Sequence, residues 1–171
     1  MSANEPGCKF QKTVAIVTVS DRSARGQRED VSGQVLAERL LAEGYGINFR
    51  LVVPDEVTEI SAALRELADH AGVALIVTTG GTGLAPRDVT PEATAGVLTR
   101  TIPGMAEAMR AASLAKTPHA MLSRALVGVR GATLIVNLPG SPKGALENLA
   151  VLLPALPHAL EKIQGDTSDC A

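Results

Sequence analysis

The residues best suited to chemistry form one short segment, Thr78 to Pro91, which reads T-T-G-G-T-G-L-A-P-R-D-V-T-P. Its glycines, among them Gly80 and Gly81, permit a positive φ and let a ligand approach the backbone closely. Backbone N–H groups exposed in such a turn can bind phosphate. Asp88 follows the turn, and a carboxylate beside bound phosphates suits a magnesium ion. The segment therefore predicts a turn that binds phosphate and magnesium.

The same pattern has a simpler interpretation, because a glycine-rich turn after a strand is often only a tight turn. The segment is not a Walker A loop, and it is not the dinucleotide fingerprint G-x-G-x-x-G. The next residues also suit the start of a helix, since Thr90 can cap it, Pro91 fits its first position and Glu92 its first turn. A ligand-binding turn and a structural turn both remain open on these residues alone.

A buried parallel strand is expected directly before this turn, because 73–77 is an unbroken apolar run. Further β-rich runs predict strands at 13–19, 49–53, 126–130 and 133–138, the last two as a hairpin or a bulged pair. Residues 20–30 are predicted to be a polar loop. Amphipathic stretches predict helices at 32–43, 56–70, 90–99, 105–116 and from 143 to 163, the last one broken or kinked at Pro154 and Pro157. This alternation predicts an α/β domain of three layers, a mostly parallel sheet with helices on both faces.

Ligands in such sheets bind beyond the carboxyl ends of the strands. Four polar segments fall at these ends: Ser20-Asp21, Pro54-Asp55, Gly80 to Asp88, and Pro139 to Pro142. We therefore expect them to converge on one site. Asp55 is its second candidate carboxylate, although on the sequence alone it could simply cap the helix that begins near Glu56 or Thr58.

Composition narrows the class of protein. The 171 residues suit one domain, with a core of aliphatic side chains because 46% of residues are apolar and only 2% aromatic. A net charge of −2 and the scarcity of aromatic rings argue against a nucleic-acid partner. No apolar run suits a signal peptide or a membrane span, and Cys8 and Cys170 lack the spacing of a metal site, so we expect a cytoplasmic protein. We expect a flexible arm over 1–11, the domain over 12–165 and a tail over 166–171.

Taken together, these segments resemble the molybdopterin adenylyltransferase family, which comprises the MogA and MoaB proteins and the G domains of gephyrin-type enzymes. The resemblance runs from residue 12 to residue 166. The matching pieces include V-S-D-R, G-Q-R-E-D-V-S-G, V-P-D-E, T-T-G-G-T-G-L-A-P-R-D-V-T-P-E-A-T, I-P-G-M-A-E-A-M-R, and L-S-R-A-L-V-G-V-R-G-A-T-L-I-V-N-L-P-G-S-P-K-G. The combination of T-G-G-T-G with R-D-V-T-P is the most specific of them.

The resemblance implies an activity and its partners. Members of the family use ATP to adenylylate the terminal phosphate of molybdopterin, assisted by Mg²⁺, and they are typically trimers with an α/β fold. For this chain it implies ATP and molybdopterin as substrates, a homotrimer, and contact with a molybdate-insertion protein. Trimer contacts are expected at Met105, Met109 and the Leu152-Leu153 region, because Met and Leu suit a patch between subunits.

The resemblance also carries roles to individual residues. It implies that Asp88 and Asp55 are catalytic and hold the metal. The residues implied to bind substrate are Ser20, Asp21, Gly26, Asp30, Gly33, Thr79, Gly80, Gly81, Thr82, Gly83, Pro139, Gly140, Ser141 and Pro142.

Two other functions remain compatible with the sequence. A related trimer could serve as a non-catalytic scaffold that binds molybdopterin, but retention of both Asp55 and Asp88 favours the enzyme. The chain could also be another nucleotide or pyrophosphate enzyme that shares this domain, such as the N-terminal part of competence-damage proteins, but the match through the C-terminal piece L-L-P-A-L-P-H-A-L argues against it.

Overall fold

The structure describes residues 12–167, which form a six-stranded sheet with helices around it. The strand order in the sheet is β2-β1-β3-β6-β5-β4. In this computed structural model β1, β2, β3 and β6 run parallel, whereas β5 and β4 add an antiparallel edge. The strands are β1 (Thr13–Val19), β2 (Gly46–Val53), β3 (Leu75–Thr79), β4 (Arg100–Thr101), β5 (Val127–Arg130) and β6 (Thr133–Leu138). The predicted mostly parallel sheet is thus confirmed, and the pair at residues 127–138 is a hairpin.

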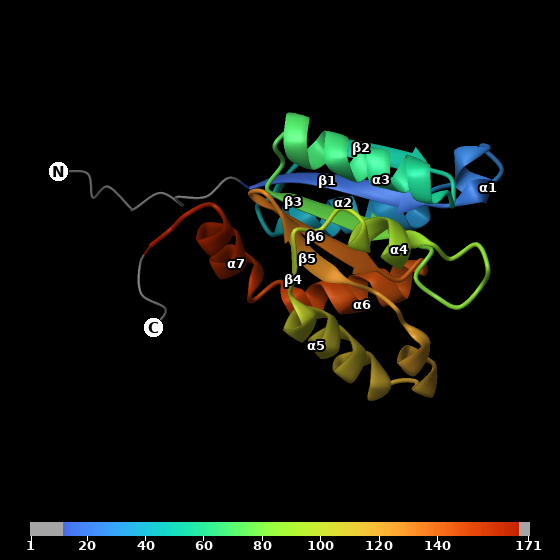
Figure 1. Ribbon diagram of the computed structural model, residues 1–171. Coiled ribbons are helices and arrows are strands. Elements are labelled where there is room, and N and C mark those ends of the chain that lie inside the picture. The colour runs from blue at the N-terminus through green and yellow to red at the C-terminus, as the bar shows by residue number, and fades with distance from the viewer. Residues whose placement is uncertain (1–11, 168–171) are drawn as a thin grey trace.

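Helices cover both faces of this sheet (Figure 1). They are α1 (Asp21–Ala24), α2 (Val31–Ala42), α3 (Val57–Arg65), the π-helical turn η1 (Glu66–His70), α4 (Thr90–Ala95), α5 (Pro103–Leu114), the 3₁₀ helix η2 (Pro118–Leu122), α6 (Pro142–Leu152) and α7 (Leu156–Ile163). Among residues 12–167, none of these helices has the length and apolar character needed to cross a membrane.

Two aliphatic cores separate the three layers, because successive side chains of a strand point to opposite faces. Val14 and Ile16 of β1 pack in the core formed with α2, α5, α6 and α7. Ala15 and Val17 pack in the second core, formed with α3, η1 and α4. The central strands β1, β3 and β6 are therefore buried on both sides, which confirms the predicted three-layer architecture.

Several predicted element boundaries are wrong: β2 begins at Gly46 instead of residue 49, β3 spans Leu75–Thr79 instead of 73–77, and three further differences have a clear physical reason or concern a whole element. The loop predicted over 20–30 contains α1, because the Ser20 Oγ accepts a hydrogen bond from the Ser23 N–H at 3.2 Å and so caps the helix. The helix predicted to reach Thr99 ends at Ala95, since the Thr99 N–H bonds the Val129 carbonyl at 2.8 Å and the chain joins the sheet edge. Residues 118–122, which were not predicted to be helical, form η2.

The expected trimer contacts are also partly wrong. Met109 and Leu152 are each only 2% exposed within the single chain, because both belong to the core under α5 and α6. They cannot form a surface between subunits. The predicted arm over 1–11, both cysteines and residues 168–171 of the predicted tail lie outside the described residues.

Candidate active site

The four parallel strands β1, β2, β3 and β6 all end at the same edge of the sheet, where α1 lies in Figure 1. A cavity of about 350 Å³ lies at this edge. We call it the first cavity, and it is lined by Thr18, Val19, Ser20, Ser23, Arg28, Glu29, Asp30, Val31, Ser32, Asp55, Thr79, Gly80, Gly81, Gly140 and Ser141. The structure thus brings residues from all four predicted strand ends together.

Two glycine turns, after β3 and after β6, pack directly on each other in the wall of this cavity. Gly80 has φ +102°, and a Cβ there would lie 2.3 Å from the Val19 carbonyl oxygen. A Cβ on Gly140 would lie 3.2 Å from the Gly80 Cα. The Thr79 hydroxyl donates to the Pro139 carbonyl at 2.7 Å and joins the two turns. At Gly80 glycine is therefore required by space as well as by φ, whereas at Gly140 an added Cβ would make a tight contact.

Thr90 fixes the first glycine turn from the other side. Its hydroxyl donates to the Gly80 carbonyl at 2.8 Å, and Gly81, at φ +65°, leaves room for that hydroxyl. Thr90 is the first residue of α4, after Val89, so the predicted role of Thr90 as a helix cap is wrong. The threonine instead ties the start of α4 to the turn.

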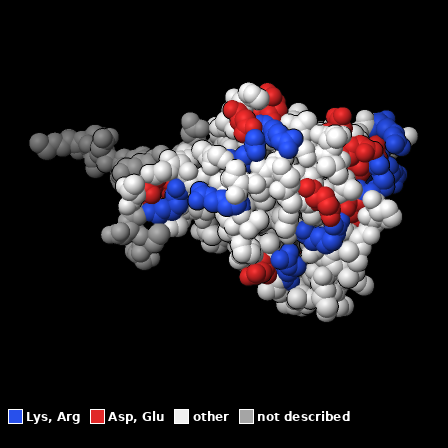
Figure 2. Space-filling model, in the orientation of Figure 1, with Lys and Arg blue, Asp and Glu red and all other residues white. Residues whose placement is uncertain are grey.

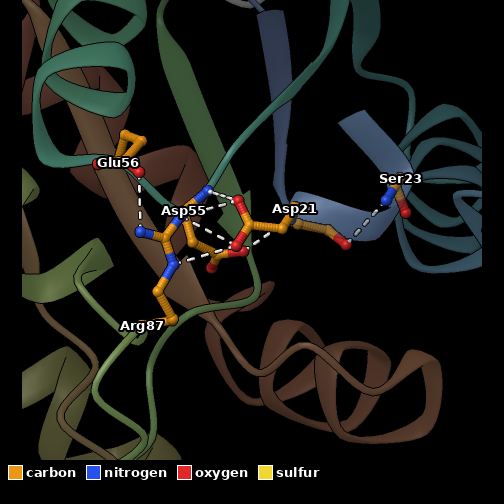
Figure 3. Close-up of polar contacts among 6 residues, drawn as sticks. Asp21, Ser23, Asp55, Glu56 and Arg87 are labelled. Carbon is orange, nitrogen blue, oxygen red and sulfur yellow. Dashed lines mark hydrogen bonds and ion pairs between the residues drawn. The ribbon is translucent and has the colours of Figure 1, made fainter. Parts of the chain in front are cut away.

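Asp21 and Asp55 form a reciprocal pair that links the ends of β1 and β2 (Figure 3). The Asp21 N–H donates to the Asp55 Oδ2 at 2.7 Å, and the Asp55 N–H donates to the Asp21 Oδ1 at 3.1 Å. In the described chain α3 begins at Val57 with no side-chain cap, so the interpretation of Asp55 as a helix cap is wrong. Each aspartate instead fixes the backbone of the other.

Arg87 extends this pair to the loop after β3. Its Nη2 and Nε donate to Asp21 at 2.9 and 3.1 Å, and its Nη1 donates to Glu56 at 2.8 Å (Figure 3). A planar guanidinium suits such a paired geometry. Figure 2 shows acidic and basic side chains interspersed at this end of the molecule, without a large patch of one sign. Arg87 is therefore a bridge between strand ends.

The pKa values of the two aspartates are shifted in opposite directions. The Arg87 guanidinium holds the pKa of Asp21 below its usual value. Burial raises the pKa of Asp55, although the hydrogen bond from the Asp21 backbone opposes this shift. The charges of Asp21 and Asp88 raise the pKa of Asp55 further, and Arg87 lowers it. Asp55 is thus a partly buried carboxylate whose ionised form gains from a nearby cation.

Asp88 occupies a different position from Asp55. Its Oδ2 accepts the Ala85 N–H at 2.8 Å, and a Cβ on Gly83 would lie 2.8 Å from the same oxygen. The carboxylate therefore lies inside its own loop, beside the glycine turn. Within residues 12–167, Asp88 lines neither the first cavity nor a second cavity, which shares Ser141 with it.

That second cavity, of about 330 Å³, opens between α5, η2 and α6. It includes the predicted residues Thr82, Gly83, Pro139 and Ser141, and Ser141 lines both cavities. The other residues of its wall were missed: Arg110, Ser113, Lys116, Thr117, His119, Ala120, Leu122, Ser123, Gly144, Glu147 and Asn148. Nothing in their spacing signals a site, because tertiary packing brings them together.

Several predicted binding residues also stabilise helix starts. The Asp30 Oδ1 accepts the Gly33 N–H at 2.8 Å, and its Oδ2 accepts the Thr18 hydroxyl at 2.9 Å. Gly33 is needed because a Cβ there would lie 2.1 Å from that Oδ2. Ser141 caps α6 by accepting the Gly144 N–H at 3.2 Å, and Pro142 is the first residue of that helix. Gly33 and Pro142 line neither cavity among the described residues.

The carboxylates at this edge fit a magnesium ion that is shared with phosphate. Asp55 offers Oδ1, which accepts no hydrogen bond within residues 12–167 and lies 3.2 Å from the position of a Gly81 Cβ. The described residues contain no cluster of three or more His, Cys, Asp or Glu side chains able to hold a metal alone. Mg²⁺ in phosphate-transfer sites usually binds one or two carboxylates together with substrate phosphates. The carboxylates at this edge would form a site of that kind, in which substrate phosphates supply further ligands.

Comparison with known proteins places this geometry in a family. The model of a family described as a probable molybdopterin binding domain matches residues 15–158. A molybdopterin adenylyltransferase of Helicobacter pylori is 41% identical over 157 residues, covering 90% of the chain and 88% of that protein. Gephyrin of Dictyostelium discoideum is 43% identical over 171 residues, covering 94% of the chain but only 24% of gephyrin.

A solved structure agrees with these matches. The molybdopterin biosynthesis enzyme MoaB of Thermus thermophilus superposes with a TM-score of 0.86 at 52% identity. The superposition covers 92% of this chain and 98% of that one.

Proposed function

The chain belongs to the family of probable molybdopterin binding domains, and on this basis we propose that it is a molybdopterin adenylyltransferase. The reaction transfers AMP from ATP to the terminal phosphate of molybdopterin and releases pyrophosphate. The observation that carries the proposal is the position of Asp55, which the Asp21 N–H holds at the first cavity beside Gly81. The site thus combines a fixed carboxylate with a turn suited to phosphate.

The proposed reaction joins two polyanions and needs no protein nucleophile. An oxygen of the molybdopterin phosphate attacks the α-phosphorus of ATP, and the bond from that phosphorus to the β-phosphate oxygen breaks. The electron pair of the broken bond leaves with pyrophosphate. The protein must hold both groups in line and stabilise the charge that grows at the α-phosphate. Backbone N–H groups of the turn at Gly81 to Gly83 are suited to that task, whereas the Gly80 N–H donates to the Leu138 carbonyl at 3.2 Å.

Asp55 is the residue best placed to hold Mg²⁺, with Asp88 contributing from the loop beside the turn. When bound, Mg²⁺ would neutralise negative charge on the phosphates. Asp21 and Arg87 keep Asp55 in place, because Asp21 donates its N–H to Asp55 and Arg87 fixes the Asp21 carboxylate. We therefore assign Asp55 and Asp88 to the metal and Asp21 to the support of Asp55.

The two cavities are suited to two substrates. They share Ser141, and residues of both glycine turns line each of them, so groups bound in the two cavities would meet at these turns. Arg28 lines the first cavity, and Arg110, Lys116 and His119 line the second, so each offers at least one basic side chain to an anionic substrate. This arrangement supports a reaction between two bound phosphate compounds.

We also propose that residues 12–165 form one domain and that the protein is cytoplasmic. In this proposal the chain assembles as a homotrimer and contacts a molybdate-insertion protein. Edge strand β2 offers a better interface than the buried Met109 or Leu152, because it exposes Phe49, Leu51 and Val52. Exposed apolar side chains on an edge strand favour contact with another subunit. Sedimentation equilibrium should give three times the 17.6 kDa mass of the chain. A monomer at micromolar concentration would contradict the proposed assembly.

The direct test of the proposed function is a product assay. The purified chain is incubated with molybdopterin, ATP and Mg²⁺, and adenylylated molybdopterin and pyrophosphate are measured. We expect both products in equal amounts. ATP consumption without adenylylated molybdopterin would identify a different nucleotide reaction, and binding of molybdopterin without turnover would support the scaffold function instead.

A further inference from the structure

Arg124 holds the loop that joins the glycine turn to Asp88 through several hydrogen bonds. Its N–H donates to the Thr82 carbonyl at 3.0 Å, and its Nε donates to the Gly83 carbonyl at 2.7 Å. Its Nη2 donates to the Asp88 carbonyl, and its Nη1 pairs with the Glu92 carboxylate. One side chain, 34% exposed, thereby holds both ends of the loop and the start of α4.

Besides Arg124, the side chain of Arg87 ties this loop to the rest of the fold. The Asp88 N–H donates to the Ala85 carbonyl, and the Asp88 carboxylate accepts from the Ala85 N–H, so both bonds are internal to the loop. Leu84 at its tip is 63% exposed. Arg87 extends outward to Asp21 and Glu56. Two arginine side chains therefore hold this part of the loop: Arg124 bonds the Asp88 carbonyl, and Arg87, the residue before Asp88, pairs with Asp21 and Glu56.

We propose that Arg124 is a positioning residue for adenylyl transfer, which acts by holding the main chain at Gly83 and Asp88 so that the Asp88 carboxylate stays beside the glycine turn. The inference rests on the proposed function. Arginine suits this role better than lysine, because its planar guanidinium presents several donors in fixed directions, whereas an ammonium group is a point charge. Ser123 lines the second cavity, so Arg124 also connects that wall to the loop.

Arg130 provides a matched control away from the site. Its guanidinium pairs with Asp69 at 2.8 and 2.6 Å and donates to the Val97 carbonyl at 2.9 Å. Its side chain is 25% exposed, a fraction similar to the 34% of Arg124. Like Arg124, it binds both a carboxylate and a main-chain carbonyl. Loss of either arginine should therefore cost similar stability, but only loss of Arg124 should affect the loop at the glycine turn.

The experiment compares Arg124→Gln, Arg124→Lys and Arg130→Gln in the adenylylation assay, each with a melting curve. Since a misplacement of about 1 Å can cost about 10²-fold in rate, we expect about 30-fold lower kcat for Arg124→Gln and about tenfold for Arg124→Lys. The KM for ATP should change by less than about threefold, because binding to the turn is retained. Arg130→Gln should keep the wild-type rate.

A double variant shows whether Arg124 acts through Asp88. In the Asp88→Asn background, loss of Arg124 should lower the rate by less than about threefold, because there is no carboxylate left to position. Multiplication of the two separate losses would overturn the inference, and so would equal rates for folded Arg124→Gln and Arg130→Gln. If Arg124→Gln does not fold, Arg124→Lys decides by the same criteria. Absence of product with the wild-type protein would instead refute the proposed function.

Discussion

Asp55 and Asp88 are held at the same edge of the sheet by different means. Asp55 follows β2 directly, and the reciprocal hydrogen bonds with Asp21 fix it to the end of β1. Asp88 lies eight residues beyond Gly80, in a loop that Arg124 ties down from a distant part of the chain. The first carboxylate is positioned by neighbouring strands and the second by a loop that the side chains of Arg124 and Arg87 hold.

This difference separates the expected roles. Asp55 lines the first cavity and has one oxygen available beside Gly81, which suits a permanent metal ligand. The Asp88 carboxylate accepts a hydrogen bond from Ala85 within its loop, so its contribution depends on how that loop is held. Variants of the two carboxylates, of the glycine turn and of Arg87 should therefore differ in their effects, from the largest at Asp55 to the smallest at Arg87.

Asp55→Asn should have the largest effect. The amide oxygen can still accept the Asp21 N–H, so the fold should be retained, but the negative charge for the metal is lost. We expect kcat to fall about 10³-fold, or about 4 kcal/mol of transition-state stabilisation. The rate and the melting temperature should be measured on one preparation. A normal rate with a lowered melting temperature would make Asp55 only structural.

Asp88→Asn should cost less, because Asp55 would still hold the metal. We expect kcat to fall about 100-fold, or about 2.7 kcal/mol, with folding intact. The informative quantity is the ratio between the fall in kcat of Asp55→Asn and that of Asp88→Asn. Both values of kcat should be measured at saturating substrate concentrations. Near-normal adenylylation by the Asp88 variant would remove this residue from the mechanism.

Gly81→Ala tests whether the turn binds nucleotide or only turns the chain. The new Cβ would lie 2.4 Å from the Thr90 hydroxyl, at φ +65°. We expect ATP affinity by calorimetry to fall about tenfold. Gly131→Ala is the control, since Gly131 also has positive φ but has nothing within 4 Å of an added Cβ.

The control should lose about 1–2 kcal/mol of stability from the left-handed backbone alone and keep its ATP affinity. Equal affinity in the wild type and in a folded Gly81→Ala protein would leave the turn with a structural role only.

The smallest effects should be shifts of the acid limb of the pH profile of kcat/KM, in opposite directions for Arg87→Gln and for Asp88→Asn. The rate requires ionised Asp55, so it falls as pH falls through the raised pKa of Asp55. Arg87 lowers this pKa and the Asp88 charge raises it. Arg87→Gln should therefore move the acid limb to higher pH, whereas Asp88→Asn should move it to lower pH. Movement in the same direction by both variants would exclude Asp55 as the titrating group.

The fold could be predicted from sequence because its signals are local. Apolar runs such as 73–77 and helical stripes such as 56–70 report burial directly, and their alternation leaves few sheet topologies. The convergence of Asp21, Asp55 and Gly80 followed from the rule that parallel strands end at one edge. The family resemblance was carried by the same strand-end motifs.

Contacts between distant segments could not be predicted in this way. Thr90 has the spacing of a helix cap, yet its hydroxyl bonds Gly80, because Gly81 leaves the space. Arg124 precedes a strand in the sequence, and only the folded chain brings it to Gly83 and Asp88. The second cavity was missed for the same reason, since α5, η2 and α6 form it together.

The central claim is that Asp55 holds Mg²⁺ against the phosphates of ATP at the glycine turn. Its most direct test is the dissociation constant of ATP, measured by calorimetry with and without Mg²⁺ for the wild type and Asp55→Asn. Mg²⁺ should tighten ATP binding to the wild type by at least about tenfold and should have little effect on the variant. An equal effect of Mg²⁺ on both proteins would contradict the claim.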